Sequence, residues 1–169
     1  MKQIPLTQGQ FALVDDEDFE ELSKHSWQIQ KLKNGKFGYA IRTEFMPKKH
    51  TVYMHCAIMG MHKIDHADTM RLNNQRYNLR VASPRENAQN RPKRINSSSQ
   101  YKGVAYRKDS KQYRAYIQDG KLIHLGQFGK DEIAAAKAYD KEALQRFGKF
   151  ANLNFPIDQP IGSEESHGN

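Results

Sequence analysis

The amino-acid sequence predicts an α+β fold built from several small pieces. Short stretches with strand character alternate with turn residues, and two later segments carry the signals of capped helices. The hydrophobic fraction is 37% and the mean hydropathy is −0.89, which favours small cores over one large core. The predicted pieces are an N-terminal α+β unit over 1–50, a strand–loop–strand–helix (ββα) core over 51–90, a basic linker over 91–99, a three-stranded antiparallel sheet packed on one helix over 100–156, and a disordered tail over 157–169.

Positive charge gathers in the middle and C-terminal parts of the chain. The formal net charge is +8; residues 51–99 hold 8 basic and 3 acidic side chains, and residues 100–156 hold 11 and 6. Such a surface attracts a polyanion by releasing condensed counterions, although a basic surface without a partner is the alternative. No apolar run approaches the ~20 residues of a membrane helix, and the single cysteine, Cys56, excludes an internal disulfide. We expect an intracellular protein without a membrane partner.

The N-terminal unit carries structural rather than catalytic signals. Residues 11–14 read as a short strand, and the acidic run 15–18 stands where a helix N-terminus favours negative charge. Residues 27–29 and 39–42 look like hairpin strands joined through Asn34-Gly35. We therefore interpret this unit as a scaffold or as an accessory DNA-contact surface.

In the second unit, polar residues suited to chemistry follow the predicted elements closely. Asp65-His66 comes at the end of a strand predicted over 61–64, and Asn78 stands at the start of the strand over 79–82. Ser83, Pro84 and Glu86 match a capping box, which puts Asn87 in the first turn of a helix.

These residue types suit phosphodiester hydrolysis. A carboxylate and an amide carbonyl are oxygen ligands for a hard cation such as Mg²⁺, and an imidazole can take a proton from water near neutral pH. Taken singly, an Asp-His pair is usually an ordinary surface pair and asparagines usually mark turns. The joint pattern in a basic chain favours a metal-and-base site.

Residues 54–91 resemble the HNH nuclease family, and specifically its His-Asn-Asn subgroup of phage and intron homing endonucleases. The resemblance implies a ββα-metal nuclease core with His66 as general base, and with Asp65 and Asn87 as ligands of Mg²⁺ or another divalent cation such as Mn²⁺. It gives Asn78 the role of orienting the histidine or bracing the hairpin, and Asn73 and Asn74 that of shaping the loop. A phage origin, and with it the cytoplasm of a bacterial host, is implied by the resemblance alone.

This segment departs from the family pattern in one feature and matches it at one further position. The loop over 67–71 lacks the glycines that family members usually carry there, so its turn must be built without glycine. A second histidine, His55, occupies a recurrent family position, where a structural role is favoured over catalysis.

The last ordered segment is predicted to present a polar sheet face. Strands over 104–107, 113–118 and 122–125 are separated by turn residues, and a helix runs from Asp131 to Gly148. Alternation puts Arg114, Tyr116 and Gln118 on one face of the middle strand. A face of this composition can grip phosphates and read base edges; an ordinary solvated face is the alternative.

Five motifs between 100 and 156 resemble, in order, the ethylene-response-factor (APETALA-type) DNA-binding domain. The resemblance implies that a three-stranded sheet enters the DNA major groove. Several plant contact positions differ, among them Ala105, Tyr116, Gln118, Leu122 and His124, so the plant recognition sequence does not transfer. The predicted DNA-binding residues are Lys102, Arg107, Arg114, Tyr116, Gln118 and His124.

Together these patterns predict a metal-dependent, homing-type endonuclease that nicks or cuts double-stranded DNA held by its C-terminal sheet. The products would carry 5′-phosphate and 3′-hydroxyl ends. The competing hypothesis is a non-catalytic, sequence-specific DNA-binding regulator with a degenerate nuclease fold. A nuclease directed at RNA is a weaker third hypothesis.

Overall fold

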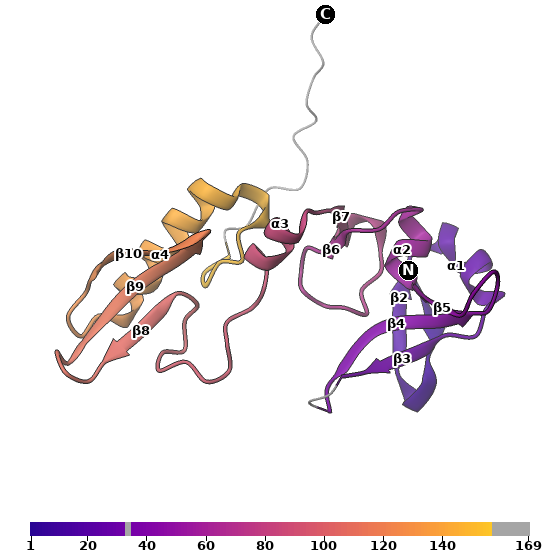
Figure 1. The fold of residues 1–169 in the computed structure, drawn as a ribbon, viewed down its shortest axis with the longest axis horizontal. Helices are drawn as coiled ribbons and strands as arrows, with labels where there is room; N and C mark the ends of the chain where they lie inside the picture. Colours follow the sequence, from indigo (N-terminus) through magenta and orange to yellow (C-terminus); the bar gives the residue numbers. More distant parts are fainter. Residues whose placement is uncertain (33–34, 157–169) are drawn as a thin grey trace, which may run out of the picture. The chain divides into compact units, whose positions relative to one another are not determined.

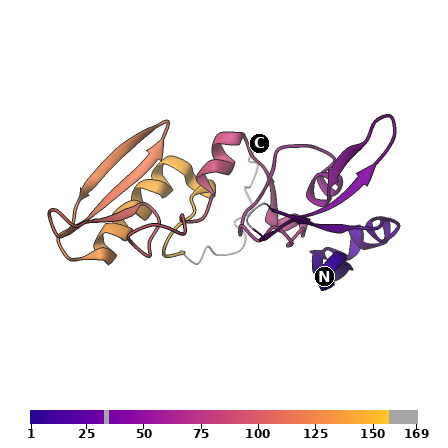
Figure 2. The same cartoon turned by 60° about the horizontal axis from the view of Figure 1, so that its bottom comes forward.

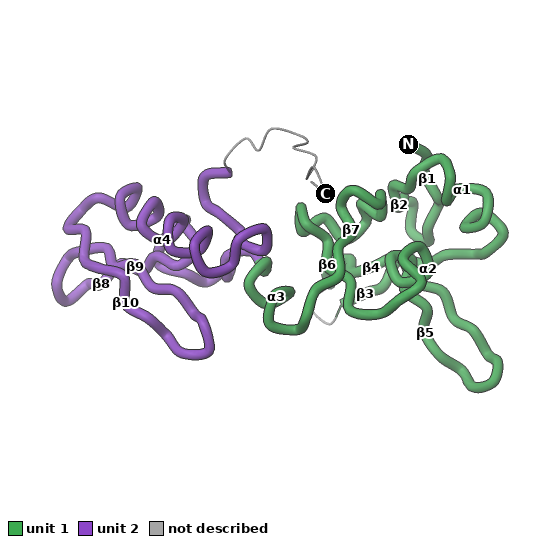
Figure 3. Tube along the Cα trace, turned by 90° about the horizontal axis from the view of Figure 1, so that it is seen from above, with its two compact units in different colours: residues 1–91 green, residues 92–169 purple. Residues whose placement is uncertain are grey.

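The computed structural model of the chain describes residues 1–32 and 35–156 (Figure 1). The chain divides into two compact units, Met1–Arg91 and Pro92–Asn169 (Figure 3). Small antiparallel sheets and helices make up both, which confirms the predicted α+β class. Asn34 of the predicted hairpin turn and the tail over 157–169 lie outside the described residues. Within those residues, no helix is long and apolar enough to cross a membrane.

Unit 1 begins with a hairpin and a short helix. Strand β1 (Lys2–Pro5) pairs with β2 (Phe11–Val14), and α1 (Asp16–Ser23) follows with three acids in its first turn, where the helix dipole favours them. The strand predicted over 11–14 and the helix after it are confirmed. Strand β1 was not predicted, and it is the pairing partner that β2 requires.

A three-stranded antiparallel sheet follows, in the order β3-β4-β5. It consists of β3 (Gln28–Lys31), β4 (Phe37–Glu44) and β5 (His50–Tyr53), with Glu44 opposite His50 at one end and Ile41 opposite Tyr53. The sequence indicated parts of β3 and β4 but not β5. Strand β5 leads directly into α2 (Met54–Met59), which ends at Gly60 in the left-handed conformation that glycine adopts without strain.

The ββα segment forms as a hairpin and a capped helix. Strand β6 (Ile64–His66) pairs with β7 (Leu79–Val81), putting Asp65 opposite Arg80, and α3 (Pro84–Gln89) follows. The capping box between Ser83 and Glu86 is present in both directions. The strand predicted over 61–64 starts later, because the chain turns after Gly60 and through Lys63, which has a positive φ.

One hydrophobic core joins the predicted N-terminal unit to the ββα segment. Backbone hydrogen bonds from the amide of Leu13 to the carbonyl of Leu72 (2.8 Å) and from the amide of Asn74 to the carbonyl of Leu13 (2.8 Å) tie β2 to the loop after His66. Residues 1–50 thus support that loop directly, and the predicted boundary at residue 50 falls inside one compact unit. Among the buried members of this core are Ile4, Val14, Trp27, Met54, Ile64 and Leu79.

Unit 2 consists of a sheet with a helix on one of its faces (Figure 2). The strands are β8 (Val104–Arg107), β9 (Gln112–Asp119) and β10 (Lys121–Gln127), in the order β10-β9-β8, and the helix is α4 (Glu132–Phe147). Asp131 caps α4 by accepting a 2.8 Å hydrogen bond from the amide of Ala134. A Cβ at Gly103 would lie 1.9 Å from the Tyr139 ring, so only glycine permits this approach. The predicted strands and helix are confirmed.

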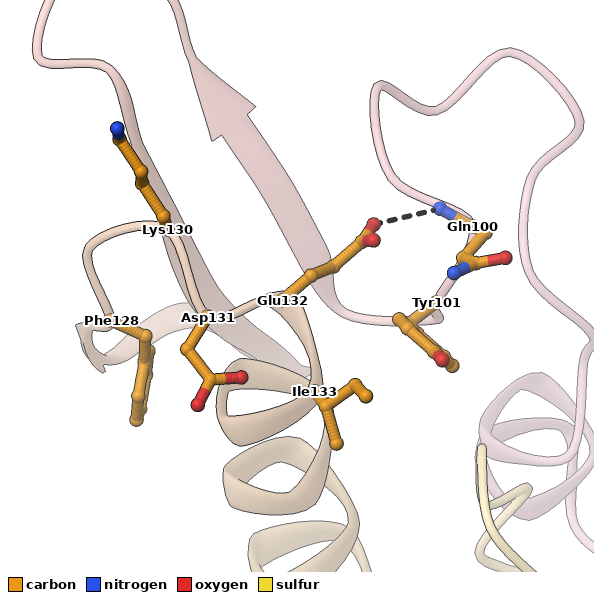
Figure 4. Close-up of a pocket in the computed structure, with 7 residues that line it drawn as sticks. All are labelled: Gln100, Tyr101, Phe128, Lys130, Asp131, Glu132 and Ile133. Carbon is orange, nitrogen blue, oxygen red and sulfur yellow. Dashed lines mark hydrogen bonds between the residues drawn. The ribbon is translucent and has the colours of Figure 1, made fainter.

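The serines at the end of the predicted linker belong to unit 2. The Ser99 hydroxyl donates to Oε1 of Glu132 (2.7 Å), and the amide of Gln100 donates to the same oxygen (3.2 Å; Figure 4). These contacts border an open depression of about 670 Å³ beside the start of α4.

Candidate active site

The end of β6 is the centre of the candidate site. Asp65 and His66 are both buried there. The Arg80 guanidinium donates to Oδ2 of Asp65 from Nη2 (2.8 Å) and Nε (3.1 Å), and Asn90 Nδ2 donates to the same oxygen (2.9 Å). Within the described residues, these three hydrogen bonds to the carboxylate all end on Oδ2.

Asn90 connects α3 to the strand that carries Asp65 and His66. Besides Asp65, its Nδ2 donates to the backbone carbonyl of His66 (2.8 Å). Sequence reasoning gave Asn90 and Arg80 no role. These contacts follow from the position of Arg80 opposite Asp65 on the paired strand and from the position of Asn90 at the C-terminal end of α3.

Asn87 is a residue of α3, three positions before the C-cap Asn90, and it is exposed. Residues three apart lie on the same side of a helix, so Asn87 shares the side on which Asn90 meets Asp65. The predicted ligand pair, Asp65 and Asn87, thus comes from adjacent elements whose contact Asn90 secures.

The imidazole of His66 has a defined tautomer. Nε2 of His66 lies 3.3 Å from Oδ1 of Asn74, and Asn74 is fully buried, with its Nδ2 donating to the carbonyl of Leu72 (3.2 Å). That second bond fixes which end of the amide carries oxygen. Because an amide oxygen only accepts, Nε2 must carry the proton, and Nδ1 is the basic nitrogen.

Burial favours the neutral form of His66. Burial lowers the pKa of its imidazole below the ordinary value, while the bond to Asn74 and the nearby carboxylates of Asp68 and Asp65 act in the opposite direction. A neutral imidazole with a basic Nδ1 can accept a proton from water. The arrangement therefore has what a general base needs.

Asn78 makes contacts that brace the loop after His66. Its Oδ1 accepts from the Asp68 amide (2.9 Å), and its Nδ2 donates to Oδ1 of Asp68 (2.8 Å) and to the carbonyl of Asn73 (2.8 Å). Thr69 takes the left-handed conformation (φ 63°) in place of a glycine. The asparagine in contact with the histidine is Asn74, and nothing in the sequence distinguished it from its neighbours.

An aromatic cluster surrounds His66 on the side of β4 and α2. The Tyr39 ring lies 5.7 Å from the His66 ring, and the His55 ring lies 5.0 Å from it, both between centroids. Tyr53 packs 5.5 Å from His55, and the Arg71 guanidinium lies 5.3 Å from the Tyr39 ring. The sequence indicated neither tyrosine, because the contacts arise only when β4 meets β6.

His55 is a buried, neutral member of this cluster. Burial, with a smaller contribution from His66, lowers its pKa to about 4. Its Nδ1 is buried and has no hydrogen-bond partner within the described residues. Its described contacts are the ring packing just given.

A divalent cation fits the donor chemistry of this site. Oxygens from one carboxylate and one amide suit a hard cation that completes its shell with water and phosphate oxygens. The residues that the structure describes contain no group of three His, Cys, Asp or Glu side chains able to hold a metal.

The open face of the sheet in unit 2 gathers most of the predicted DNA-binding residues. Arg114, Tyr116 and Gln118 of β9 alternate with buried Ala115 and Ile117. The register puts His124 opposite Tyr116, with ring centroids 5.1 Å apart. Arg107 of β8 pairs with Gln112 of β9, and by alternation both lie on the same face as Arg114.

Lys102 lies apart from this group. Its Nζ is 5.8 Å from the ring centroid of Tyr139 on α4, and burial lowers its pKa to about 8. The amide of Lys102 donates to Oδ1 of Asn154 (2.6 Å). The Lys102 side chain therefore lies on the side of the sheet that α4 covers, and not on the open face.

Comparison with known proteins gives two separate likenesses. The chain is 31% identical over 152 residues to the uncharacterized HNH endonuclease L560 of Acanthamoeba polyphaga mimivirus, a match that covers 86% of this chain and 75% of that protein. It is also 41% identical over 61 residues to the AP2-like ethylene-responsive transcription factor TOE2 of Arabidopsis thaliana and to the APETALA2-like protein 2 of Oryza sativa subsp. japonica. The plant matches cover 36% of this chain but only 12% and 14% of those proteins. No family model matches the chain, and no solved structure does.

Proposed function

Since this chain belongs to the HNH endonuclease family, we propose that it is a metal-dependent DNA endonuclease whose cutting centre is the end of β6. The observation that carries the proposal is the hydrogen bond from His66 to Asn74, which leaves Nδ1 as the basic nitrogen of the imidazole that follows Asp65 in the chain.

The residues of this chain divide the hydrolysis between them. Oδ1 of Asp65 and the amide oxygen of Asn87 would hold a divalent cation such as Mg²⁺ or Mn²⁺. A cation there stabilises negative charge on the phosphate and on the departing 3′ oxygen. Nδ1 of His66 takes a proton from the attacking water, whose oxygen bonds to phosphorus as the bond to the 3′ oxygen breaks. Asn74 keeps the imidazole oriented throughout, and the products carry 5′-phosphate and 3′-hydroxyl ends.

Arg71 supports a negatively charged substrate at the same place. Its guanidinium lies over Tyr39, a direct neighbour of His66, and its charge is among the influences that lower the pKa of His66. A phosphate of the DNA backbone that approaches His66 from the side of this loop would therefore meet the Arg71 guanidinium.

We assign DNA holding to the open sheet face of unit 2. The likeness to plant AP2-like factors and the row of Arg114, Tyr116 and Gln118 support this assignment. The short connection between the units raises the effective concentration of one at the site of the other. A homing-type activity and a location in the cytoplasm of a bacterial host remain part of the same proposal.

One observation favours the alternative of a non-catalytic DNA-binding regulator. Asp65 is already neutralised by Arg80, which weakens its attraction for a cation. In that case DNA would be bound and left intact.

Nicking of supercoiled plasmid separates the two functions. The full-length chain is incubated with Mg²⁺ or with EDTA, beside His66→Ala and the matched variant His62→Ala, which removes an exposed histidine of the same unit. We expect metal-dependent nicking by the wild type and by His62→Ala, and loss in His66→Ala. Plasmid that is shifted in a gel but uncut would support the regulator, and preferential cutting of competitor RNA would redirect the proposal to RNA.

A further inference from the structure

The connection between β4 and β5 exposes large apolar side chains to an unusual degree. Met46 is 81% exposed, more than any other large hydrophobic side chain in the described residues, and its neighbour Phe45 is 68% exposed. Both belong to the tip of the hairpin, residues 45–49, which projects from unit 1 (Figure 3). Nothing in the fold requires these side chains to be hydrophobic.

Positive charge accompanies the apolar side chains at this tip. Lys48 and Lys49 are exposed, and residues 45–49 contain no acid. The carboxylate at the base of the hairpin, Glu44, is bound by Arg42 (2.6 Å) and lies 3.2 Å from His50 on the opposite strand. The tip thus carries positive charge around two exposed apolar groups.

We propose that this tip is a DNA wedge: Phe45 and Met46 enter between base pairs while Lys48 and Lys49 hold neighbouring phosphates. Apolar wedges of this kind unstack a base step and kink the duplex, and lysines supply the attraction that is independent of sequence. The inference rests on the proposed function in one respect, that the substrate is DNA.

Other partners fit the tip less well. A stable protein interface buries about 800 Å² on each partner, which two side chains and a proline do not supply. A lipid surface would accept the same chemistry, but stable membrane anchoring takes more than one weak signal. DNA requires only insertion into a duplex that other parts of the chain already hold.

The sheet sets the distance between the wedge and the candidate cutting centre. Tyr53, at the far end of β5, packs on His55, which packs on His66. Strand residues advance about 3.3 Å each, so His50, three residues before Tyr53 on β5, lies roughly 10 Å along the sheet, and the tip lies beyond it. At about 3.4 Å per base step, the deformation falls at least about three steps to one side of the cut.

The wedge is tested by a measurement that needs no cutting. Full-length protein in EDTA is bound to closed circular plasmid, which is then relaxed by a topoisomerase that works without metal, and the change in linking number is measured against bound protein. We expect the wild type to change the linking number and the double variant Phe45→Ala/Met46→Ala to lose most of that change. Phe11→Ala, which removes a ring 50% exposed on β2 of the same unit, should retain it.

Two outcomes would overturn the wedge. One is a wild type that binds the plasmid without changing its linking number; the other is an unchanged linking-number effect in the double variant, and if that variant also loses binding to anionic lipid vesicles, the tip is a lipid contact instead. All three substitutions are on the surface and should leave the melting temperature unchanged, which is checked first. Plasmid nicking in Mg²⁺ is assayed separately. If the wild type nicks plasmid but the double variant keeps the wild-type change in linking number, the wedge alone is rejected; if the wild type changes the linking number but does not nick, the proposed function alone is rejected.

Discussion

Replacing Asn74 with leucine tests how the structure prepares His66 for catalysis. The substitution removes the only side-chain acceptor that the structure gives to Nε2 of His66, and it keeps a side chain of similar size at a fully buried position. The backbone bond from residue 74 to Leu13 does not depend on the side chain. The histidine would then lose its tautomer preference and its orientation.

The size of the effect follows from the cost of a buried donor without a partner. That cost is about 1–3 kcal/mol, and each 1.4 kcal/mol corresponds to about tenfold in rate. We therefore expect the plateau of kcat/KM for nicking to fall by about 5–150-fold.

The pH profile separates an effect on the base from general damage. The bond to Asn74 raises the pKa of His66, so its loss lowers that pKa. A general base works in its deprotonated form, so the acid limb of the Asn74→Leu profile should move to lower pH while the plateau drops. The assay is initial-rate nicking of supercoiled plasmid across pH at saturating Mg²⁺.

Asn73→Leu is the matched control. Asn73 is also buried in this loop, but its Nδ2 donates to Asp68 and Tyr77 rather than to the histidine. The acid limb of the Asn73→Leu pH profile should stay at the wild-type pH even if the substitution lowers the free energy of unfolding. The reasoning is refuted if Asn74→Leu keeps the wild-type plateau, or if its plateau falls with an unmoved acid limb.

Three further predictions concern other residues of the chain. His55→Phe should nick within about threefold of wild type and melt no lower, because it removes a buried nitrogen without a partner; a far larger loss of rate would give His55 a catalytic role. Asn90→Ala should lower the free energy of unfolding in urea by about 1–3 kcal/mol, since it leaves the His66 carbonyl without this donor, and an unchanged midpoint would contradict the anchoring role. Arg114→Ala should weaken DNA binding and reduce the slope of log K against log salt by about one, whereas Lys137→Ala on α4 should change that slope less.

Local elements of the fold were predictable because their signals are local. The capping box from Ser83 to Glu86 and the alternation through Arg114, Ala115 and Tyr116 each use neighbours in sequence. Strand β1 was missed because its four residues, Lys-Gln-Ile-Pro, do not alternate between apolar and polar side chains in the way that predicts a strand. Strand β5 was missed for a related reason, since it is polar at His50 and Thr51 and runs straight into a helix.

The contacts of the candidate site were predictable only in part. Asp65, His66 and Asn87 stand out by residue type and by their relation to the elements. Which of Asn73, Asn74 and Asn78 contacts the histidine depends on which side chain turns toward the imidazole. That orientation is set by the backbone hydrogen bonds between β2 and the loop, whose partners lie about sixty residues apart in the sequence. Tyr39 has no sequence signal at all, because its place beside His66 depends on how two separate sheets pack.

The most direct test of His66 as the base is chemical rescue. In His66→Gly the imidazole is replaced by a space beside Oδ1 of Asn74, and added imidazole can occupy it. The account predicts that the variant does not nick plasmid in Mg²⁺ and that nicking returns as imidazole is added, following the concentration of its neutral form. A wild type that nicks while the variant shows no response to imidazole, or a variant that nicks as well without it, would contradict the account.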